Sequence, residues 1–104
     1  MDKIERNKKQ INQFIKKAHN KDEFIDKAVR WVHKPEEEGG LNLRQDPFKT
    51  SADIRLLWDR AGELGKGKKV LISWIAKMIN RIETVEGKKE TRPTNRNNNQ
   101  TTLL

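Results

Sequence analysis

Apolar residues recur at helical spacing through residues 68–86, and this stripe limits the possible folds more than any other feature. Its members are Leu71, Trp74, Ile75, Met78, Ile79 and Ile82. Steps of three and four residues place these side chains on one face of an α-helix. No useful length of the chain alternates apolar and polar residues with the period of two that marks a strand. The stripe therefore predicts an amphipathic helix in an all-α protein.

Three further segments show the same spacing, and we predict helices at about 2–19, 21–34 and 51–64. Asn20 followed by Glu23 three residues later fits a capping box at the start of the second segment. The helix-breaking ring of a proline ends that segment, and a glycine ends the third. These two residues are Pro35 and Gly65. The chain is thus expected to hold four helices.

Residues 35–50 are predicted to form a loop, because they contain two glycines, two prolines and an acidic run. Sixteen residues are long for a connection in a compact domain. Three apolar side chains are expected to hold the loop against the core: Leu41, Leu43 and Phe48. Either Thr50 or Ser51 is expected to cap the helix that follows.

The fold prediction is a compact four-helix domain over residues 1–87 with a disordered basic tail over 88–104. The tail is rich in asparagine and has almost no apolar content before its last two leucines, so it cannot bury enough surface to fold. The predicted core consists of Ile11, Phe14, Ile15, Phe24, Ala28, Val29, Val32, Ile54, Leu57, Trp58, Ala61, Leu64, Leu71, Trp74, Ile75, Met78, Ile79 and Ile82.

Composition excludes several classes of protein. The chain has no cysteine, which rules out disulfides, thiolate metal sites and thiol catalysis. Its first residues are charged, unlike a signal peptide. The longest nearly apolar run is also far shorter than the roughly 20 residues of a membrane span. We therefore expect a soluble, intracellular, cytoplasmic protein with no transmembrane segment.

Positive charge is concentrated near the C-terminus. Residues 66–104 carry nine Lys and Arg against three Glu, which accounts for +6 of the net charge of +8. A local concentration of positive charge of this kind attracts polyanions. An evenly spread charge would serve solubility equally well. The asymmetry therefore favours a nucleic acid as partner, either DNA or RNA, contacted through its phosphates.

The fourth predicted helix offers a definite binding surface, since basic and hydroxyl residues follow one another at intervals of four along it. Cations in the preceding turn and in the tail extend this row. The candidate nucleic-acid-binding residues are Lys66, Lys68, Lys69, Ser73, Lys77, Arg81, Lys88, Lys89, Arg92 and Arg96. Contacts from such a row to successive phosphates release counterions, so affinity should fall with salt. A solvated lysine face is the alternative interpretation.

Around the junction of the third and fourth predicted helices, a small residue, a turn glycine and two core residues follow one another at defined spacing. The residues are Ala61, Gly65, Leu71 and Trp74. Over about 20 residues this spacing resembles a helix-turn-helix, which would place the fourth helix in a major groove. Arg60 departs from the pattern at a position that is usually apolar. The resemblance also places Val70 and Ile72 near the base-reading side, which suits apolar residues poorly.

Catalytic and metal-binding patterns are weak. His19 and His33 lie on different predicted helices without a third ligand at metal spacing, and both are interpreted as surface residues at helix ends. The acidic run 36–38 is interpreted as a solvated loop. We predict a non-catalytic accessory protein with no catalytic residue, no metal and no cofactor.

Two other functions stay open from the sequence. A helical protein-interaction module could bind a larger protein through Leu56, which faces away from the apolar stripe of its helix, together with the loop and the tail. Small basic immunity proteins, inhibitors and viral or phage accessory factors resemble the chain in size and composition. The fourth helix could instead lie on a membrane surface. Homodimerisation is a further hypothesis, because a second copy would enlarge a small core.

Overall fold

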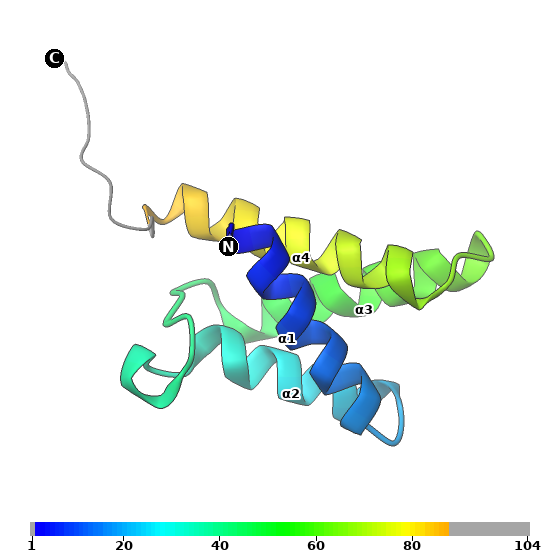
Figure 1. Cartoon of the computed structure of the whole chain (residues 1–104), viewed down its shortest axis with the longest axis horizontal. Coiled ribbons are helices and arrows are strands. Elements are labelled where there is room, and N and C mark those ends of the chain that lie inside the picture. Colours follow the sequence, from blue (N-terminus) through cyan, green and yellow to red (C-terminus); the bar gives the residue numbers. More distant parts are fainter. Residues whose placement is uncertain (1, 88–104) are drawn as a thin grey trace, which may run out of the picture.

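The computed structural model describes residues 2–87 and confirms an all-α fold with four helices in this part of the chain. They are α1 (Lys3–Lys17), α2 (Lys21–His33), α3 (Pro47–Glu63) and α4 (Lys68–Val85), and a 3-10 turn, η1 (Glu36–Glu38), follows α2. The predicted tail, residues 88–104, lies outside the described residues. Figure 1 shows α3 and α4 running alongside each other, while α1 crosses them and α2 lies beneath α1.

Local signals set most of the helix boundaries. Asn20 caps α2 as predicted, since its side chain accepts the backbone N–H of Glu23 at 2.9 Å. At the end of α3, Gly65 has the left-handed φ of +66°. The Gly65 N–H donates to Gly62 at 3.1 Å and the Lys66 N–H to Ala61 at 2.8 Å, which is the double closure of a Schellman motif. Gly65 is therefore confirmed as the helix stop.

The start of α3 corrects the predicted boundary. The helix begins at Pro47 rather than at residue 51, because Asp46 is the N-cap and its Oδ1 accepts the N–H of Phe48 at 3.1 Å. A proline in the first turn needs no hydrogen-bond partner for its nitrogen. Thr50, predicted as a cap, is instead fully buried inside the helix.

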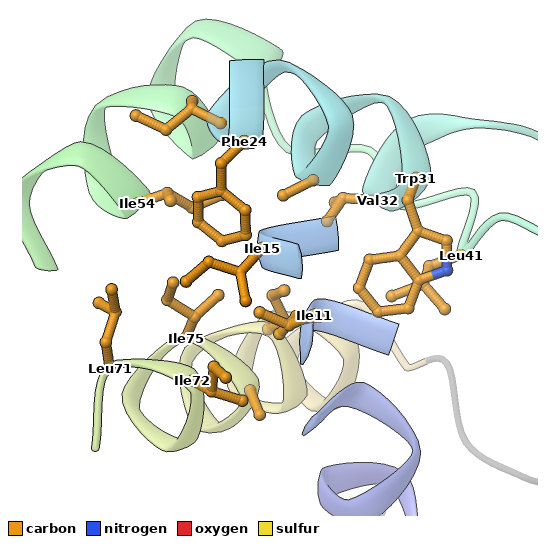
Figure 2. Packing of buried hydrophobic residues seen from close by; sticks show 14 of the residues in the cluster. Ile11, Ile15, Phe24, Trp31, Val32, Leu41, Ile54, Leu71, Ile72 and Ile75 are labelled. Carbon is orange, nitrogen blue, oxygen red and sulfur yellow. The ribbon is translucent and has the colours of Figure 1, made fainter. Parts of the chain in front are cut away.

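The core lies where α1 and α2 meet α3 and α4. In Figure 2, Ile11 and Ile15 of α1 point between Phe24 of α2 and Ile75 of α4. Most of the predicted core is confirmed as buried or as packed against the buried cluster. Leu64 was predicted wrongly, because it follows the last turn of α3 and is 55% exposed. The buried apolar helix residues that the predicted core omitted are Ile25, Trp31, Ile72 and Ala76.

The loop after α2 is held by two of its three predicted anchors. Leu41 and Leu43 are buried, and their N–H groups donate to the carbonyls of Trp31 and Val32 at 3.0 Å. Phe48 was predicted wrongly, since it is 85% exposed on the first turn of α3.

Part of the apolar face of α4 is buried by the rest of the protein. Ile75 and Ile79 are completely buried, and Leu71 is nearly so. This burial leaves only part of the face to a membrane surface, and the membrane-surface hypothesis stays a prediction. In residues 2–87 no helix combines the length and hydrophobicity needed to cross a bilayer.

A polar cluster joins α1 to α4 within this apolar packing. Arg6 donates to both carboxylate oxygens of Glu83 at 2.8 Å, and it also donates to the Asn7 carbonyl at 2.7 Å. Asn7 is fully buried, and its amide donates to Glu83 at 3.3 Å. The cluster satisfies a carboxylate that the fold removes from water, as burial of charge requires.

Candidate nucleic-acid interface

Residues 66–69, where the chain passes from α3 into α4, present three exposed cations. Lys66 lies in the turn that the Schellman closure at Gly65 fixes, and Lys68 and Lys69 are the first two residues of α4. Gly67 is the N-cap of α4 and provides no side-chain cap. Exposed N–H groups at a helix start carry partial positive charge, which adds to the charge of the lysines.

The row along α4 winds around the helix instead of following a straight line. Each residue advances about 100° around an α-helix, so a step of four residues drifts by about 40°. Lys69 therefore borders a hollow between α1 and α4, together with Lys8 and Lys9. Lys77 and Arg81 border a different surface, a groove between α3 and α4.

The intermediate member of the row, Ser73, is half-buried between these two surfaces. The structure thus brings Lys66, Lys68 and Lys69 together at one end of α4 and Lys77 and Arg81 together further along it. The remaining predicted site residues lie outside the described residues: Lys88, Lys89, Arg92 and Arg96.

The cations of the row that the structure describes have no carboxylate partner in the same part of the chain. Among residues 2–87, no Asp or Glu forms an ion pair with Lys66, Lys68, Lys69, Lys77 or Arg81. Three acidic residues interrupt the row in sequence, and the two that the structure describes have other partners. Glu83 is buried against Arg6, and Glu86 accepts the backbone N–H groups of Arg44 at 2.7 Å and Gln45 at 3.0 Å.

Sequence reasoning missed the contribution of α1 to this surface. Lys9 is exposed beside Lys69, whereas Lys8 pairs with Glu5 at 3.3 Å. The spacing of Lys8 and Lys9 resembled any solvated helix face, and only the packing of α1 on α4 places them next to the predicted row. A pattern within one helix carries no signal for such a neighbour.

The groove between α3 and α4 is the other notable surface. It has a volume of about 540 Å³ and is mostly apolar, with Leu57, Trp74, Met78 and Ile82 among its lining residues. The groove extends along α4 from Trp74 to Val85 and along α3 from Asp53 to Leu57, and Figure 1 shows the two helices running alongside each other. Helices of a helix-turn-helix cross at roughly 90–120° instead. In addition, Ile72 is buried rather than exposed for base reading. The resemblance to a helix-turn-helix is therefore one of spacing alone.

The two histidines have structural partners. His19 is exposed, as predicted, and its backbone N–H and ring hydrogen-bond the Glu23 carboxylate. These bonds, the backbone one first, lower the pKa of Glu23. His33 was wrongly interpreted as a surface residue, because it is half-buried with Nδ1 2.9 Å from the Leu43 carbonyl and Nε2 3.1 Å from the Thr50 hydroxyl.

Metal-binding geometry is absent from the described part of the chain, in which no three His, Cys, Asp or Glu residues are grouped to hold an ion. Comparisons with known proteins add no identification, since no family model, curated protein or solved structure matches the chain.

Proposed function

We propose that this protein is a non-catalytic accessory protein that binds nucleic acid through the phosphate backbone. The observation that carries the proposal is the set of five exposed cations at residues 66–69 and on α4 that have no ion pair within residues 2–87. Elsewhere in this range some cations pair with carboxylates, among them Arg6 and Lys21, and others are exposed and unpaired but lie on separate elements, among them Lys34 and Arg60. Free cations gathered on one helix provide the electrostatic attraction that non-specific nucleic-acid binding requires.

The geometry favours contacts to backbone rather than to bases. Lys77 and Arg81 lie one helical turn apart, a rise of about 6 Å, and the three cations of residues 66–69 lie at the N-terminal end of the helix. Helical cations at this spacing can meet successive phosphates, but phosphate contacts carry no sequence information. Binding should therefore be salt-dependent and nearly indifferent to sequence, for DNA and RNA alike.

Electrophoretic mobility shifts of the full chain with a 20-base-pair DNA duplex and an RNA duplex, repeated at increasing salt, test the proposal. The variant with Lys66, Lys68 and Lys69 changed to Glu should lose most of its affinity. If each lysine contacts one phosphate, the slope of log K against log salt falls by about 2.7.

A matched control carries the same change in charge elsewhere. Lys17, Lys34 and Arg60 are exposed and form no ion pair in the described structure. Their change to Glu should weaken binding far less. Absence of binding to either duplex at low salt, or equal losses in the two triple variants, would refute the proposal.

A further inference from the structure

The groove between α3 and α4 exposes apolar side chains that the fold itself does not use. Leu56 is 64% exposed on α3 and Val85 is 83% exposed at the end of α4, and both line the groove. Contiguous apolar surface of this kind marks interaction sites on soluble proteins. The apolar lining between them includes Leu57, Met78 and Ile82 together with one aromatic side chain, Trp74, so it is mostly aliphatic and suits apolar side chains of a protein.

The cations and carboxylates around the groove are equal in number but differ in their partners. Two carboxylates border it, but Asp53 pairs with Lys49 at 3.6 Å and Glu86 accepts two backbone N–H groups. The two cations that border it, Lys77 and Arg81, have no such partner among residues 2–87. An occupant that brings carboxylates to Lys77 and Arg81 would therefore be favoured over one that brings cations.

The dimensions of the groove fit a short helix. Its lining residues on α4 run from Trp74 to Val85, which corresponds to about 16 Å or three helical turns. An amphipathic helix fills such a groove with apolar side chains at positions i, i+3, i+4 and i+7. Since Lys77 and Arg81 are one turn apart, carboxylates one turn apart on the flank of the incoming helix would face them.

We propose that the α3–α4 groove binds an acidic amphipathic helix of a partner protein, with its apolar face on Leu56 and Val85 and its carboxylates on Lys77 and Arg81. Lys77 and Arg81 belong to both proposed surfaces, whereas Lys66, Lys68 and Lys69 do not line the groove and the apolar Leu56 makes no phosphate contact. Protein binding and nucleic-acid binding can therefore be tested separately.

Fluorescence anisotropy of the full chain with two labelled 15-residue peptides tests the groove. Both probes carry leucines at i, i+3, i+4 and i+7, and they differ only in having glutamates or lysines on the flanks. The acidic probe should bind about tenfold more tightly or better, and Leu56→Asp should weaken it about tenfold. The double variant K77E/R81E should reverse the preference between the probes.

Leu64→Asp is the matched control, because Leu64 is also exposed on the protein but does not line the groove; it should leave the affinity unchanged. Equal binding of the two probes, or equal loss in the Leu56 and Leu64 variants, would overturn the proposal. So would a concentration-dependent dimer in sedimentation that Leu56→Asp abolishes, since that assigns the groove to a second copy. The variant K66E/K68E/K69E should still bind the acidic probe, even where it no longer binds nucleic acid.

Discussion

Removal of Arg6 should destabilise the protein more than its partly exposed position suggests. The Glu83 side chain is 4% exposed, whereas that of Arg6 is 36% exposed. Arg6→Met leaves the carboxylate with only the Asn7 amide at 3.3 Å. Breaking a buried pair from one side costs about 3–5 kcal/mol. Because water can enter where the guanidinium was, we expect a loss of about 2–4 kcal/mol.

That loss is a large fraction of the total, since a domain of this size has roughly 4–13 kcal/mol of stability. Urea unfolding followed by far-UV circular dichroism should show a midpoint lower by about 2 M or more, for a slope near 1 kcal/mol per M. The melting temperature should fall by about 10–25 °C.

The double variant Arg6→Met, Glu83→Met provides the decisive comparison. Because it removes the buried charge together with its partner, it should be clearly more stable than Arg6→Met alone. A single variant that loses less than about 1 kcal/mol, or a double variant no better than the single one, would refute the assignment of Glu83 as a buried charge that depends on Arg6.

Two further predictions concern the backbone and pH. A Cβ at Gly40 would collide with the Lys34 carbonyl, so Gly40→Ala should lower the free energy of unfolding by about 2–3 kcal/mol. Gly62 has open space around it, so Gly62→Ala should instead stabilise α3 by up to about 1 kcal/mol. Equal effects of the two variants in urea unfolding would contradict this prediction. His19 lowers the pKa of Glu23, so the contribution of that carboxylate to stability is present above its ordinary pKa and is lost as pH falls through the lowered value. His19→Ala keeps the backbone bond, so a carbon-detected NMR titration should show the Glu23 pKa raised but still below its ordinary value; an unchanged pKa would show that the ring contributes nothing.

Much of the fold follows from the sequence because local signals agree with the tertiary structure. Three of these signals depend only on residues that are close together in sequence: the apolar stripe on α4, the cap at Asn20 and the stop at Gly65. The start of α3 was missed for a local reason as well, since Asp46 followed by Pro47 is a cap and first-turn pair. Leu64 was misplaced because helical periodicity continues the apolar stripe past the point at which the helix ends.

Features that depend on contacts between helices could not be predicted. Nothing near Asn7 or Glu83 in sequence indicates that they meet in the core, 76 residues apart. The 3.6-residue period of the helix already implies that Lys69 points away from α4 in a different direction from Lys77 and Arg81. However, the surfaces that they border depend on the positions of α1 and α3. The candidate residues could thus be read from the sequence, whereas their grouping required the fold.

The two hydrogen bonds that Glu86 accepts have a consequence for the local opening of the C-terminal end of α4. Its carboxylate holds the amides of Arg44 and Gln45, more than 40 residues away in sequence, so the end of the helix and the loop before α3 open together. Hydrogen exchange at those two amides would report fraying of α4 from a distance. A ligand that displaces this end of the helix would change hydrogen exchange at Arg44 and Gln45, two residues that it does not contact.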